Sequence, residues 1–179
     1  MERMSLGIVV ERRDIDHPWQ SSTWRTVAVV PGESDSAEWR ELARGEGWVR
    51  YHAGTLPLEI FDRETEGYRY NLSNEVPVVY VVLREDEDED RRRDRPAGPR
   101  PFLATVCPYE AQSYLDGDED MVETVPMPDA VAAWVGAFVR RHHVDEPFRK
   151  RRRRSYEPGR GGRPPDGPGG VWRTRHGRP

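Results

Sequence analysis

Two side chains in this sequence are candidates for nucleophilic chemistry. Cys107 is the only cysteine, and His52 lies on a predicted strand from which it could act as a base. A catalytic thiol needs a lowered pKa and such a partner base. A lone cysteine that ends an apolar strand just before Pro108 is otherwise a small buried side chain. A small enzyme centred on Cys107 and His52 is therefore one alternative for the function.

The remaining histidines do not suggest a metal site. They are His17, His142, His143 and His176, and no H-x₃-H or C-x₂-C spacing occurs among them. His142 and His143 lie at the end of a predicted helix, where the helix dipole favours cations. The glycines near the C-terminus lack the preceding strand and following helix of a phosphate-binding loop. We expect no metal and no cofactor.

Charge is divided sharply along the chain. Residues 1–148 contain 17 arginines and 30 acidic residues, a formal charge of −13, whereas residues 149–179 carry +9. A basic segment of this kind stays solvated and often docks on an acidic partner. We predict that its partner-binding residues are Arg151, Arg152, Arg153 and Arg154. A nucleic-acid-associated regulator using this tail is a second alternative, although the acidic body would repel a phosphate backbone.

Trp19 and Trp24 are the other candidate partner-binding residues. Only four residues separate them, and they lie at a predicted hairpin loop. Exposed tryptophans commonly anchor protein interfaces. The alternative is structural, because such a pair can also plug the end of a barrel or sheet.

The elements that would position these residues are mostly short strands. Gly54 separates two of them, and Pro31-Gly32 ends another. Their order predicts an α+β fold with an antiparallel sheet or partly closed barrel, short helices and a C-terminal amphipathic helix. The predicted strands are 5–13, 24–30, 48–53, 56–61, 76–84, 102–107 and 121–125, and the predicted helices are 38–44, 63–72, 109–115 and 129–143.

The last helix carries the clearest apolar stripe, at spacings of three and four residues. The stripe comprises Val131, Trp134, Val135, Phe138 and Val139. We predict one α+β domain over residues 1–148, interrupted by a flexible acidic loop at 85–100. Residues 149–179 form a predicted disordered basic tail rich in Gly, Pro and Arg. The single cysteine and the lack of a long apolar run favour a cytoplasmic protein.

Several segments resemble an uncharacterised bacterial protein family whose genes lie beside those of molybdenum-dependent formate dehydrogenase. The longest runs from Gly7 to Gln20 and is followed by Trp24-Arg25. The others are Tyr51-His52-Ala53-Gly54, Glu64-Thr65-Glu66, Asn71-Leu72-Ser73, 79–84, 108–112 and 144–151. The resemblance carries over no catalytic residue. It implies a non-catalytic accessory or assembly factor that binds a formate dehydrogenase subunit or maturation protein.

Overall fold

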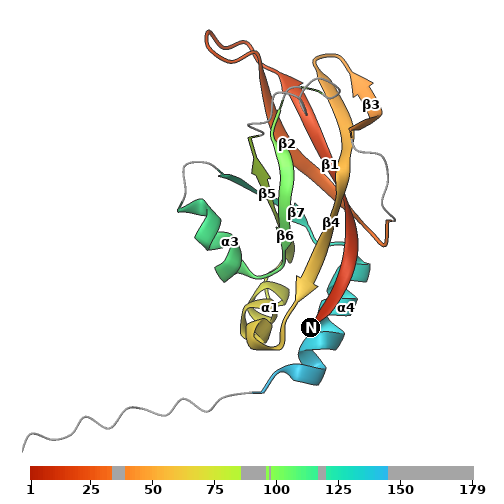
Figure 1. Cartoon of the computed structure of the whole chain (residues 1–179), viewed down its shortest axis with the longest axis vertical. Helices are drawn as coiled ribbons and strands as arrows, with labels where there is room; N and C mark the ends of the chain where they lie inside the picture. The colour runs from red at the N-terminus through yellow and green to blue at the C-terminus, as the bar shows by residue number, and fades with distance from the viewer. Residues whose placement is uncertain (34–38, 86–95, 97, 117–119, 145–179) are drawn as a thin grey trace, which may run out of the picture. The chain divides into compact units, whose positions relative to one another are not determined.

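A curved sheet of seven strands is the framework of the described residues, which are 1–33, 39–85, 96, 98–116 and 120–144 of the computed structural model (Figure 1). The strand order is β2-β1-β4-β6-β5-β7, and β3 pairs with β4 beside this path. The strands are β1 (Glu2–Asp14), β2 (Ser22–Pro31), β3 (Arg40–Gly45), β4 (Trp48–Ile60), β5 (Val78–Arg84), β6 (Arg100–Thr105) and β7 (Asp120–Pro126).

The chain divides into two units, Met1–Asp145 and Glu146–Pro179, and every described residue belongs to the first. The predicted tail at 149–179, with the partner-binding residues Arg151, Arg152, Arg153 and Arg154, lies outside the described residues. Most of the predicted acidic loop at 85–100 does so as well. The predictions for these segments stay predictions.

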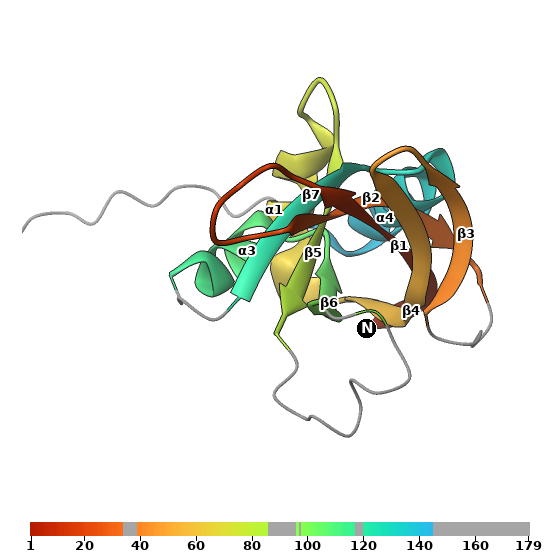
Figure 2. The same ribbon diagram turned by 90° about the horizontal axis from the view of Figure 1, so that it is seen from above.

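The sheet curls until its end strands, β2 and β7, approach each other. In the described residues these two strands are not paired by backbone hydrogen bonds. Figure 2 shows the strands from above, arranged around a common centre. Their inner face holds the core, which includes Leu6, Ile8 and Val10 of β1. The predicted α+β fold with a partly closed barrel is confirmed. The sheet is mixed rather than wholly antiparallel, because β4 meets β6 in parallel at Leu58 and Ala104.

The described helices are the 3-10 turn η1 (Asp62–Glu64), α1 (Thr65–Leu72), α3 (Pro108–Leu115) and α4 (Asp129–His142). Helices α1 and α4 pack together at the lower end in Figure 1, where the rings of Tyr68 and Phe138 lie 6.5 Å apart. Helix α3 contacts β5, β6 and β7. No helix in the described ranges has the length and apolar character needed to cross a membrane.

The apolar stripe of α4 is directed into the core as predicted. Three of its members, Val131, Val135 and Phe138, are fully buried. Trp134 packs at the margin of the core and its indole Nε1 donates a 3.0 Å hydrogen bond to Glu2 on β1. Helix α4 therefore stabilises the barrel through burial of one face.

The predicted helix at 38–44 is wrong. Residues Arg40–Gly45 form β3, which pairs antiparallel with β4 across a turn at Gly47, whose φ is +72°. All six residues of β3 are exposed. The turn brings the segment alongside β4, and the strand pairing satisfies its backbone groups.

The predicted break at Gly54 is also wrong, because β4 continues from Trp48 to Ile60. Gly54 has a φ of +127° and lies at a shift in the register between β4 and β1. Glycine adopts this conformation without a steric penalty. It therefore forms a β-bulge that bends one long strand instead of ending it.

Asn71 connects α1 to the sheet. Its side-chain Nδ2 donates hydrogen bonds of 2.8 Å to the carbonyl oxygens of Val78 and Val106, and its Oδ1 accepts one from the Val78 N–H. The residue is fully buried. This single amide satisfies backbone groups at the start of β5 and just beyond β6.

Candidate functional site

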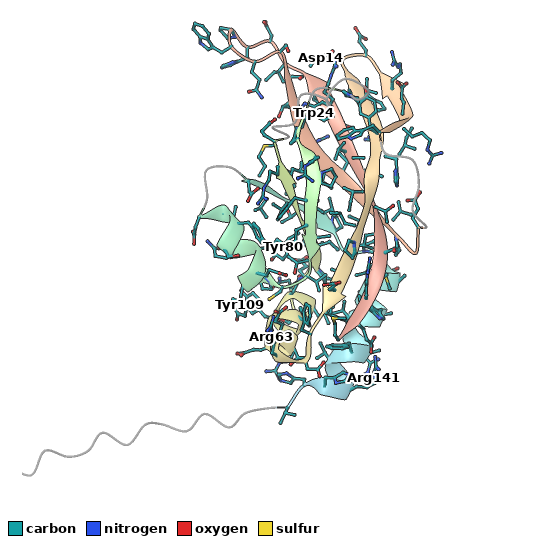
Figure 3. The ribbon with its side chains drawn as sticks, in the orientation of Figure 1. Asp14, Trp24, Arg63, Tyr80, Tyr109 and Arg141 are labelled. Atoms are coloured by element: carbon teal, nitrogen blue, oxygen red, sulfur yellow. The ribbon has the colours of Figure 1, made fainter. Side chains whose placement is uncertain are left out.

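Trp19 lies in the loop between β1 and β2 and is 91% exposed. The Ile15 N–H donates to the Ser21 carbonyl at 3.1 Å, which closes the base of this loop. The loop leaves β1 at Asp14, which Figure 3 shows at the opposite end of the barrel from Arg141 of α4. A large aromatic side chain exposed to this degree is a candidate anchor for a partner.

Trp24 lies in a different environment, and its position corrects the prediction that it binds a partner. It is only 9% exposed, and its ring centroid lies 5.9 Å from Trp39 and 6.1 Å from Tyr51. A side chain at Gly98 would collide with its indole. Trp24 is therefore a packing residue that closes this end of the barrel, and only Trp19 of the predicted pair is available to a partner.

A cluster of arginines around Glu11 lies between this end and the middle of the sheet. In the strand register, Glu11 of β1 lies between Arg25 of β2 and Arg50 of β4, and Arg13 follows on the same face of β1. The Glu11 carboxylate accepts hydrogen bonds of 3.1 Å from Arg13, 2.8 Å from Arg25 and 2.9 Å from Arg50. We call these four residues the arginine cluster.

The carboxylate is completely buried, although the three guanidinium groups above it are about half exposed. Burial alone would raise the pKa of Glu11, but hydrogen bonds from Arg50, Arg25 and Arg13 outweigh it and hold the pKa below its usual value. Glu11 therefore remains ionised and fixes three cations on the surface. The cluster carries a formal charge of +2 on a body that is acidic overall.

The arginine cluster is absent from the sequence-based predictions. Glu11 is a charged residue at the end of an apolar alternation, and its partners on β2 and β4 lie 14 and 39 residues further along the chain. A charged residue on the face of a strand that is otherwise buried is the one signal that could have identified it. Its partners followed only once the register of β2 and β4 was known.

The structure does not bring Cys107 and His52 together. Ala104 lies beside Leu58 in the parallel pair, Cys107 is three residues beyond Ala104, and His52 is six residues before Leu58. The separation along the strands is roughly 25–30 Å at about 3.3 Å per residue. Burial also raises the pKa of the Cys107 thiol.

His52 is itself buried against another polar side chain. Its Nε2 lies 3.1 Å from the Glu33 carboxylate, and this pair packs over Gly7 of β1. A larger side chain at Gly7 would collide with both residues. The absence of a side chain at Gly7 therefore makes room for the contact between β4 and the end of β2.

His142 and His143 connect α4 to the region around α1. His143 contacts the Thr65 hydroxyl at 3.1 Å and Arg69 at 3.0 Å, and His142 Nδ1 lies 3.7 Å from the Asp62 carboxylate. Within the described part of the chain, no three His, Cys, Asp or Glu side chains gather where a metal ion could be held.

Comparison with known proteins identifies a family but no closer relative. A family model described as "Protein of unknown function (DUF3305)" matches residues 5–152, from β1 to beyond α4. Neither a curated protein nor a solved structure matches the sequence. Because the match covers most of the chain, this protein belongs to the DUF3305 family.

Proposed function

We propose that this protein is a non-catalytic cytoplasmic accessory or assembly factor that binds a subunit or maturation protein of a molybdenum-containing formate dehydrogenase. The enzyme context comes from the segments between residues 7 and 151 that resemble the family encoded beside formate dehydrogenase genes. The protein-binding role rests on the surface around the β1–β2 loop.

The observation that carries the proposal is the exposure of Trp19 at the tip of a loop whose other tryptophan is buried. Binding that removes an exposed indole from water lowers the free energy of the complex. The two strands that the loop joins also carry Arg13 and Arg25, whose side chains are about half exposed. Tryptophan and arginine are the residue types most enriched at interface hot spots.

Binding, rather than catalysis, also agrees with the state of the candidate nucleophile. The Cys107 thiol is buried and its pKa is raised, whereas a reactive thiolate needs the opposite shift. Its predicted base, His52, lies on a part of β4 that is distant from Cys107, and it contacts the Glu33 carboxylate. These features support a role that does not depend on Cys107.

Affinity purification from the native cell tests the proposal. Wild-type protein should retain a formate dehydrogenase subunit or maturation protein, and Trp19→Ala should lose it through faster dissociation at any salt concentration. Tyr70→Ala is the matched control, because Tyr70 is an exposed aromatic on α1. Neutralising Arg151 to Arg154 should slow association at low salt and have little effect at high salt.

A negative result is also decisive. The proposal is wrong if the wild-type protein retains no molybdoenzyme component and deletion of its gene leaves formate oxidation intact under inducing conditions. Equal retention by Trp19→Ala and wild type would remove Trp19 from the interface while leaving the partner assignment in place.

A further inference from the structure

A polar pocket lies beside the arginine cluster, at the seam where β2 and β7 approach each other without a described ladder. It is open to solvent and has a volume of about 320 Å³. Its lining includes Arg25 and Thr26 of β2, Arg50 of β4 and Thr124 of β7. Residues from three strands, two of them arginines, therefore line one opening.

The two arginines retain donors after they bind Glu11. Arg25 uses Nε and Nη2 on the Glu11 carboxylate, and Arg50 uses Nε. Each guanidinium has a second edge, formed by its two Nη atoms, that can bind two oxygen atoms at once. Because Glu11 holds both groups in place, little side-chain entropy is lost when they bind a ligand.

Thr124 of β7 adds a hydroxyl from the other strand of the seam. The residue is exposed and lines the pocket together with Arg25. A hydroxyl can donate one hydrogen bond, so Thr124 can bind an oxygen atom of a group that the arginines hold.

The charges around the pocket favour a doubly charged anion. The arginine cluster carries +2, and Glu123 of β7 interacts electrostatically with Arg25. Two guanidinium edges and a hydroxyl offer more donors than one planar carboxylate accepts. A tetrahedral group with several oxygens matches that number of donors.

The geometry points to a binding site for a phosphate group in this pocket, with Arg25 and Arg50 on its oxygens and the Thr124 hydroxyl as a further donor. The pocket lies near the lower limit of small-molecule sites, which suits a phosphate monoester on a compact molecule. This inference does not depend on the proposed partner and extends the protein's role to a small ligand.

Isothermal titration calorimetry at constant ionic strength tests the site with three probes: inorganic phosphate, glycerol 3-phosphate and succinate. Phosphate should bind saturably, and succinate, a dicarboxylate of similar charge, should not. Tighter binding of glycerol 3-phosphate than of inorganic phosphate would identify a phosphorylated small molecule as the source of the group. Equal binding would identify free phosphate. Equal binding of succinate, or no saturable binding of phosphate, would overturn the inference.

Thr124→Val is the most informative variant, because it keeps the side-chain shape and removes the hydroxyl of an exposed lining residue. It should fold as wild type and bind phosphate about 10-fold more weakly. Arg25→Lys keeps the charge but removes the two-pronged edge, so binding should fall at least as far. If the folded Thr124→Val and Arg25→Lys proteins both bind phosphate as tightly as wild type, the site is also overturned.

Two further variants test the electrostatic argument. Glu123→Gln removes the opposing charge beside Arg25 and should tighten phosphate binding, by about fivefold. Arg44→Met is the matched control, because Arg44 lies on β3, pairs with Glu41 and is not among the lining residues. It lowers the net charge by one and should leave phosphate binding unchanged.

Discussion

Glu11 and Asn71 are buried polar side chains that each join three segments of the fold. Glu11 connects β1 to arginines on β2 and β4, and Asn71 connects α1 to the backbone at Val78 and Val106. A buried polar group stabilises a fold only while its partners are present, because losing one leaves others unsatisfied. Both residues are therefore sensitive to substitutions that preserve their size.

Asn71→Asp should be strongly destabilising. The substitution replaces the Nδ2 donor by a carboxylate oxygen, so the carbonyl groups of Val78 and Val106 lose their hydrogen bonds beside a buried charge. We expect the free energy of unfolding to fall by about 3 kcal/mol or more. Urea unfolding measures the change. Asn74→Asp, at an exposed position just after α1, is the control and should stay within about 0.5 kcal/mol of wild type.

Glu11→Gln should lower the free energy of unfolding at neutral pH and should make that free energy less dependent on pH in the acid range. The folded-state pKa of Glu11 lies below its usual value of 4.5, so its stabilisation is present above that value and is lost as the pH falls through the folded-state pKa. The variant lacks this contribution and leaves three arginines without their counter-ion. Urea unfolding should show a loss of about 2 kcal/mol at neutral pH. The two proteins should converge in acid, and parallel pH profiles would contradict the assignment.

At the scale of elements, the helices depend on what they pack against. Helix α1 has eight residues, too few to be stable alone, and is held by Asn71 and by Tyr68, whose hydroxyl donates to Glu64 at 2.8 Å. Helix α4 is longer and buries one face in the core. Each of these two helices contains one glycine, and replacing it by alanine tests whether helix propensity or side-chain packing decides the change in stability.

Gly67→Ala and Gly136→Ala should have opposite effects on stability. A methyl group at Gly67 would lie 3.0 Å from the Cys107 sulfur and 3.1 Å from the Tyr109 ring, so the gain in helix propensity should be outweighed, with a net loss of about 1 kcal/mol. At Gly136 the nearest atom is the flexible end of Arg140 at 3.4 Å, so the substitution should stabilise by about 0.5–1 kcal/mol. Thermal unfolding of both variants measures the difference, and a stabilising Gly67→Ala would show that α1 and α3 are more loosely packed.

At the scale of the whole molecule, the described core and the basic C-terminal segment are separate in the sequence. Every described strand and helix ends by His142, and the core cluster closes with Phe138 and Val139 of α4. The strongly basic residues 149–179 follow this unit. Folding and partner encounter can therefore depend on different parts of the chain.

Truncation after Pro147 should leave the thermal midpoint within a few degrees of wild type, because the described core is complete before that residue. Differential scanning calorimetry checks the midpoint and the cooperativity of the transition. The same truncated protein should associate more slowly with its partner at low salt, because the Arg151 to Arg154 run is missing. Loss of a cooperative transition would place the domain boundary further along the chain.

Local patterns in the sequence were enough to determine several elements. The alternation that includes Leu6, Ile8 and Val10 predicted a strand at 5–13, and the spacing of Val131, Val135 and Phe138 predicted the apolar face of the last helix. These patterns are readable because periodic burial requires periodic apolar residues. The charge division at residue 149 also follows from the sequence alone.

Other features were decided only by the tertiary structure. Residues Arg40–Gly45 form a strand because β4 lies beside them, and Gly54 is a bulge because β1 continues past it. Trp24 is buried and Trp19 exposed because Trp39 and Tyr51 surround only the former. Strand register brings arginines from β2 and β4 to Glu11 over separations of 14 and 39 residues, and no local pattern encodes such contacts.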